Sequence, residues 1–90
     1  MTIITLSENS IEIQGHSPEK IVCHGVSAIC NMVANYVIDN HWGKAIAREG
    51  YVKIYDIEEE YIDDHLFKAM IDALIDIQAE YPNNIQINYM

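Results

Sequence analysis

A histidine and a cysteine near the N-terminus are the side chains of this sequence best suited to covalent chemistry. His16 follows Gly15, and Cys23 stands seven residues after the histidine, where the apolar pattern of a helix begins. An imidazole within hydrogen-bonding reach of a thiol can accept its proton, and the resulting thiolate is a strong nucleophile. The residue types therefore predict a catalytic Cys/His pair, provided that the fold brings the two side chains together.

A helix start is the element that would activate this thiol. The first turn of a helix leaves backbone N–H groups unpaired and carries a partial positive charge, which favours a thiolate. The amides of Cys23 and its neighbours are also expected to hold the oxyanion that forms when the thiolate attacks a peptide carbonyl. Gly15 permits a tight bend that turns His16 toward the helix, and Ser27, one turn after Cys23, is expected to support the pair.

The position of the helix start decides between two interpretations. Ser17, Pro18 and Glu19 fit an N-cap, a first-turn proline and an early acid, which would place the start at Pro18. His16 and Cys23 would then be roughly 10 Å apart along the helix axis. The catalytic interpretation requires a start near Ile21. A structural role for Cys23 also stays open, because free cysteines are among the most commonly buried residues.

Composition and charge limit the partners of the chain. Five basic residues stand against 14 acidic ones, and the net charge of −9 disfavours binding to nucleic acid. The N-terminus lacks a basic region followed by a long apolar run, so we expect a cytoplasmic protein that does not enter a membrane. Half of the residues are hydrophobic, which in a chain of 90 residues favours contact with a second copy, a homodimer.

Hydrophobic periodicity predicts one α+β domain over residues 1–90, a small mixed sheet packed with two helices. Alternating residues indicate a hairpin over 2–6 and 11–14, and the period then changes to that of a helix from Ile21 to about Asn40. A second hairpin is expected over 44–47 and 51–57, then a second helix ending before Pro82 and a last strand over 85–89. The order is ββαββαβ.

The predicted second helix is apolar on two sides. One face carries Ile62, Leu66, Met70, Ala73, Leu74 and Ile77. A second row consists of Phe67, Ile71 and Ile75. Helices that are apolar on two sides are usually buried on both, so the second row is a candidate homodimer contact, with packing against the first helix as the alternative.

Other potential sites carry weaker signals, and we expect neither a metal nor a cofactor. Cys23 and Cys30 are two helical turns apart, which argues against a disulfide and against a zinc site with His24. The acidic run 58–60 is expected to precede the second helix as a solvated segment, since no calcium loop surrounds it. His24 and Lys20 are expected to lie beside the cleft.

The residues around the Cys/His pair also resemble those of a known family. Gly15-His16 followed by Ile21-Val22-Cys23 and Ser27-Ala28 is similar to the signature of the ribosomal-processing cysteine proteases, the Prp family. The aromatic strand after Gly50 and the ending from Glu80 to Tyr89 look like that family as well. The resemblance therefore covers nearly the whole chain.

This resemblance implies a small homodimeric cysteine endopeptidase that acts on a protein substrate. Family members of this kind remove an N-terminal extension from a ribosomal protein or process phage capsid and scaffold proteins. Carried over by position, Cys23 matches the nucleophile and His16 the general base, while Gly15 matches a hinge glycine and Ser27 a supporting serine.

Two departures from the family pattern define an alternative. The loop between His16 and Cys23 is shorter than is usual for the family, and Lys20 stands where an acidic residue usually precedes Ile-Val-Cys. A cation near Cys23 favours the thiolate but cannot stabilise an imidazolium on His16. The alternative is a catalytically inactive, dimeric peptide-binding module that keeps the pair without turnover.

Overall fold

The computed structural model describes all 90 residues and has the predicted α+β architecture. Its elements follow in the order β1 (Thr2–Leu6), β2 (Ile11–Gln14), α1 (Lys20–Asp39), β3 (Lys44–Arg48), β4 (Tyr51–Tyr55), a 3-10 turn (Glu59–Tyr61), α2 (His65–Glu80) and β5 (Ile85–Tyr89). Both predicted hairpins, both helices and the last strand are therefore confirmed.

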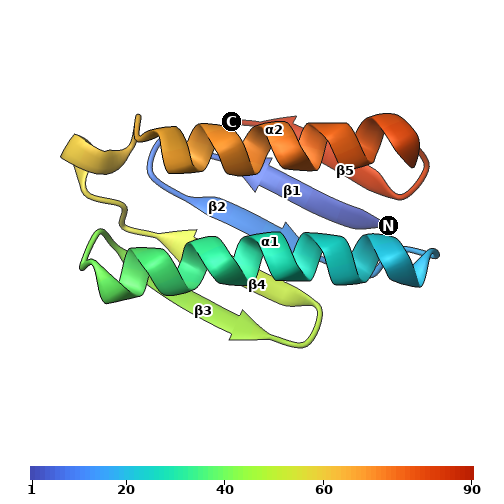
Figure 1. Ribbon diagram of the computed structural model, residues 1–90, viewed down its shortest axis with the longest axis horizontal. Helices are drawn as coiled ribbons and strands as arrows, with labels where there is room; N and C mark the ends of the chain where they lie inside the picture. Colours follow the sequence, from blue (N-terminus) through green and yellow to red (C-terminus); the bar gives the residue numbers. More distant parts are fainter.

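One mixed sheet carries all five strands in the order β3-β4-β2-β1-β5. Neighbouring strands are antiparallel except for β1 and β5, which pair in parallel from Thr2 with Ile85 to Leu6 with Tyr89. The two helices lie side by side on the same face of the sheet and run in opposite directions (Figure 1). The arrangement places the first turn of α1 near the end of β2 that carries His16.

The core lies between this sheet face and the two helices. Alternate strand residues such as Ile4, Ile13 and Ile54 point into it, as the period of two predicts. The buried residues of α1 recur at helical spacing and are Val22, Val26, Cys30, Val33, Ala34 and Val37. By length and composition alone α1 would be apolar enough to cross a membrane, but here its buried stripe packs into the core.

The second helix begins later than its apolar pattern suggested. The acidic residues form the 3-10 turn, and Asp64 caps α2 by accepting a hydrogen bond from the Leu66 amide at 2.9 Å. The predicted second row does not act as one surface, because Phe67 is buried in the core whereas Ile75 is 39% exposed. Phe67 thus packs inside the molecule and is not available for a contact between copies.

The second hairpin brings its turn to the functional site. β3 extends to Arg48, one residue further than predicted, so Glu49 and Gly50 alone connect it to β4. Gly50 has a φ of +72°, a conformation that favours glycine in a two-residue connection.

Candidate active site

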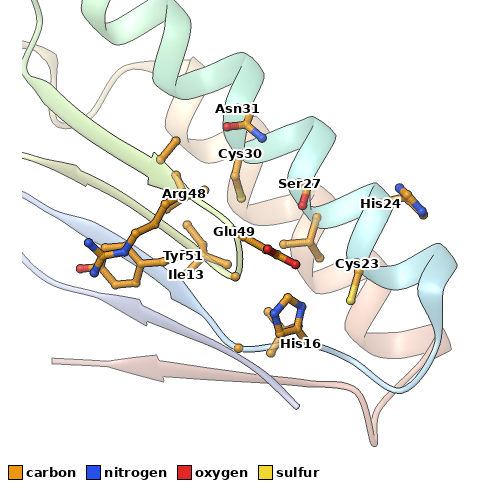
Figure 2. Close-up of a pocket in the computed structure, with 16 residues that line it drawn as sticks. Ile13, His16, Cys23, His24, Ser27, Cys30, Asn31, Arg48, Glu49 and Tyr51 are labelled. Atoms are coloured by element: carbon orange, nitrogen blue, oxygen red, sulfur yellow. The ribbon is translucent and has the colours of Figure 1, made fainter.

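A cavity of about 440 Å³ opens between α1, the end of β2 and the β3–β4 turn. Residues from all three elements line it, including Gly15, His16, Cys23, Ser27, Glu49 and Gly50. In Figure 2 the Cys23 sulfur and the His16 imidazole both lie on the side of α1 that faces the turn. The fold therefore brings the predicted pair to one cavity.

The start of α1 agrees with the interpretation that the catalytic hypothesis requires. The helix begins at Lys20, next to the expected Ile21, and Glu19 occupies the cap position without a side-chain cap hydrogen bond. Ser17 does not cap the helix, because its hydroxyl is used in bonds to Thr2 and Asn84. Residues 15–19 remain a loop, and Cys23 sits in the first turn, half-buried at the cavity.

The backbone of Ser17 surrounds the Cys23 sulfur. The Ser17 amide donates to Sγ at 3.1 Å, and the Ser17 carbonyl lies 3.5 Å from Sγ, where it can accept the thiol proton. The Cys23 amide is not free, because it donates to the Glu19 carbonyl at 3.3 Å. The expectation that this amide holds an oxyanion is therefore wrong for Cys23, since the helical hydrogen bond already uses it.

His16 lies in the loop after β2 and is exposed. Its imidazole packs against the β3–β4 turn so closely that a Cβ on Gly50 would stand 2.7 Å from Nε2. Gly15 has a φ of +95°, and its amide donates to the Gly50 carbonyl at 2.9 Å, which fixes the loop to the turn. No hydrogen bond joins His16 to Cys23 in this conformation.

The remaining predicted site residues divide into two groups. Ser27 and Gly15 line the cavity as expected, and so does His24, although Figure 2 shows its ring pointing away from the cavity. Lys20 is exposed at the helix start and is not among the residues that line the cavity, so its place beside the cleft stays a prediction.

Cys30 shows what burial does to the second thiol of α1. It lies two turns further along the helix and also borders the cavity, but its side chain is fully buried. Burial raises the pKa of Cys30 to about 12, because the low-dielectric core disfavours the thiolate. No group of three His, Cys, Asp or Glu side chains converges on a common point, so the geometry offers no metal site.

Three residues at the site were not singled out from the sequence. Glu49 lines the cavity from the β3–β4 turn, and Ser17 and Asn84 hold the loop beside Cys23. Ser17 resembled a helix cap, and Asn84 lies 67 residues away from it in the chain. Only tertiary structure brings these residues together. The turn around Pro82 was predicted from the sequence, but the contact of Asn84 with Ser17 was not.

Comparison with known proteins gives a family match and several structural matches. The sequence matches the family described as Cysteine protease Prp over residues 2–86. A search of curated protein sequences found no match. The fold matches the ribosomal processing protease Prp of S. aureus in complex with a substrate peptide, with a TM-score of 0.81, 20% identity and 100% coverage of both chains.

Two further structures have the same fold. The S. aureus protease with a covalently linked product peptide matches with a TM-score of 0.79 and 22% identity over 100% of both chains. SMU.848 from Streptococcus mutans matches with a TM-score of 0.72 and 21% identity, over 99% of this chain and 91% of the other.

The fold and the family match together define a small α+β cysteine protease. The chain belongs to the Prp family of cysteine proteases, because the match extends over residues 2–86 of its 90 residues. The predicted family and the predicted enzyme class are thereby confirmed.

Proposed function

We propose that this protein is a cytoplasmic endopeptidase that removes an N-terminal extension from a ribosomal protein, with Cys23 as nucleophile and His16 as general base and acid. The observation that carries the proposal is the placement of a half-buried thiol in the first turn of α1, on a cavity that His16 also lines. The S. aureus relatives, which are described as ribosomal processing proteases and bind a peptide, support the choice of substrate class.

The reaction would proceed by acyl transfer. His16 takes the proton from the Cys23 thiol, and Sγ attacks the carbonyl carbon of the scissile peptide bond. As the tetrahedral intermediate collapses, the imidazolium donates its proton to the leaving amine and a thioester remains on Cys23. His16 then removes a proton from a water molecule, which attacks the thioester and releases the second product with regeneration of the thiol.

The resting position of His16 sets a requirement for this reaction. The imidazole packs on Gly50 and is not hydrogen-bonded to Sγ, so it must move toward Cys23 when a peptide occupies the cavity. Gly15, with its positive φ, is the residue of the loop best able to change its backbone angles for this movement. Ser27, exposed on the same helix face, would contact the pair or the peptide.

A non-catalytic, peptide-binding module is the second candidate function. The absence of a hydrogen bond between His16 and Cys23 in this conformation favours it, because an imidazole and a thiol that stay apart cannot transfer a proton. In that case the cavity would hold an extended peptide without cleaving it. A phage capsid or scaffold protein is the second candidate substrate. It ranks below a ribosomal protein because the S. aureus relatives are described as ribosomal processing proteases.

A homodimer is part of the proposal. Large apolar side chains remain exposed on α1, among them Ile21 at 66%, Met32 at 59% and Tyr36 at 46%. Such side chains favour contact with a second copy of this acidic chain. Sedimentation velocity should give a mass of two chains, and a Met32→Glu variant should shift it to one.

The direct test is cleavage of precursors with native N-termini. The protein is incubated with a ribosomal protein precursor or with a capsid precursor, and products are identified by mass spectrometry. The proposal expects a shortened ribosomal protein that is lost in Cys23→Ala and kept in Cys30→Ala. Cleavage of the capsid precursor alone would replace the substrate, and stable binding without any cleavage would establish the non-catalytic module.

A further inference from the structure

The short connection between His16 and α1 is held by hydrogen bonds to Thr2 and Asn84. Ser17 is only 8% exposed, and its hydroxyl is hydrogen-bonded to Thr2 Oγ1 at 2.6 Å and to the Asn84 carbonyl at 3.0 Å. The Glu19 amide donates to the Asn84 side-chain oxygen Oδ1 at 3.0 Å. Asn84 therefore holds the connection at both of its ends, once through its backbone and once through its side chain.

Asn84 is itself fixed by the sheet. It directly precedes β5, and its carbonyl accepts a hydrogen bond from the Thr2 amide at 2.8 Å where β1 and β5 begin. Thr2 and Asn84 are 3% and 8% exposed, so this polar network is shielded from water. Buried hydrogen bonds of this kind are costly to break, because the released groups would lose their partners without gaining solvent.

The tied connection has a direct effect at the nucleophile. It places the Ser17 amide 3.1 Å from the Cys23 sulfur, while the Cys23 amide is used by Glu19. An N–H donor bonds more strongly to a thiolate than to a neutral thiol, so a fixed donor at this position stabilises the thiolate. The Ser17 amide thus contributes to the stabilisation of the thiolate that was expected from the helix start.

We propose that Asn84 is a positioning residue that holds the Ser17 amide against the Cys23 sulfur, and that this amide stabilises the nucleophilic thiolate. The inference rests on the proposed function only in the assignment of Cys23 as nucleophile. It implies that the connection from Ser17 to Glu19 is a rigid part of the site, in which the donor is already in place before a peptide binds.

Charged groups around the cavity also influence the reactivity of Cys23, so their influence must be distinguished from that of Asn84. His16 and His24 face or flank the cavity from the loop and from α1, and Arg48 and Glu49 line it from the second hairpin. The Met1 ammonium donates to the His16 carbonyl at 2.6 Å, and Glu19 and Lys20 stand at the exposed start of α1. None of them is altered in an Asn84→Ala variant, so a change in Cys23 reactivity in that variant reports on the hydrogen-bonded connection.

The first test is the pH profile of Cys23 alkylation by iodoacetamide, resolved by mass spectrometry of the Cys23 peptide. Asn84→Ala should move the midpoint of the profile upward by about one pH unit, which corresponds to about tenfold less thiolate at neutral pH. Asn83→Ala is the matched control, because the Asn83 side chain is exposed and makes no hydrogen bond. A lower melting temperature of Asn84→Ala with an unchanged midpoint would reduce Asn84 to a structural residue and overturn the proposal.

The second test uses the unmodified protein and so does not depend on the folding of a variant. The amide proton of Ser17, followed by NMR from pH 5 to pH 10, should titrate with the midpoint of Cys23 alkylation, and the transition should vanish in Cys23→Ala. The Thr2 amide, which donates to Asn84 instead, should not follow it. A Ser17 amide that ignores the thiol, or that changes only with His16 as shown by His16→Gln, would contradict the inference. Both tests are independent of proteolysis, so a failed cleavage assay would reject the proposed function alone.

Discussion

The two cysteines of α1 both border the cavity but differ in burial. Cys23 lies in the first turn, half-buried at the cavity, with the Ser17 amide 3.1 Å from its sulfur. Cys30 lies two turns later, fully buried, and the core raises its pKa to about 12. The position along the helix, and not the residue type, therefore decides which thiol can react.

The largest effect in this comparison should come from His16. His16→Ala removes the proposed proton carrier of Cys23 and should lower kcat/KM for precursor cleavage by about 10²–10⁴-fold. Cys30 has no role in the chemistry, so Cys30→Ala should retain the cleavage rate per folded molecule. Equal activity of His16→Ala and the unmodified protein would remove the histidine from the mechanism.

The buried thiol should make the stability of the fold depend on pH in the alkaline range. The pKa of Cys30 rises from 9.0 to about 12 on folding, so its contribution to the free energy of unfolding is complete below pH 9 and is lost as pH rises toward 12. The full shift corresponds to about 4 kcal/mol. Urea unfolding at pH 8 and pH 10.5 should show the decline, and Cys30→Ala should show a smaller one. Parallel pH profiles for the two proteins would contradict the burial argument.

Substitution of two glycines near Cys23 should have smaller effects, which differ between Gly50 and Gly25. Gly50→Ala places a Cβ 2.7 Å from His16 Nε2 at a φ of +72°, so it should displace the imidazole, lower kcat about tenfold and destabilise the fold by about 1 kcal/mol. Gly25→Ala is the matched control, because its Cβ would meet only Ile77 Cδ1 at an ordinary 3.6 Å. This helical substitution should stabilise the protein by about 0.5–1 kcal/mol without slowing cleavage. Similar kinetics of both variants would show that contact with Gly50 does not position His16.

Local patterns in the sequence were sufficient to predict the helices, the strands and the pair of His16 and Cys23. The change of period after residue 20 predicted α1, and the Gly15-His16 and Cys23 spacing predicted a site that the fold places on one cavity. The start of α1 was left between two interpretations, because the cap signal of Ser17 is a local one. Its hydroxyl instead bonds to Thr2 and Asn84, and a contact across 67 residues leaves no local trace.

The apolar residues of α2 were also harder to interpret, because their burial depends on contacts with parts of the chain that are distant in sequence. Phe67, Ile71 and Ile75 have regular helical spacing, but Phe67 is buried and Ile75 is 39% exposed. Which part of such a row is covered depends on tertiary packing, which periodicity alone does not encode. The donor to the Cys23 sulfur was missed in the same way, since it is a backbone amide whose position depends on the loop and not on residue type.

The most direct test of the account is alkylation of the two cysteines in one folded sample, followed separately by mass spectrometry across pH. The account predicts that Cys23 reacts rapidly at neutral pH, because the Ser17 amide 3.1 Å from its sulfur stabilises the thiolate. Cys30 should stay unmodified up to the pH at which the protein unfolds. Slow and equal modification of Cys23 and Cys30 would contradict the assignment of Cys23 as an activated nucleophile.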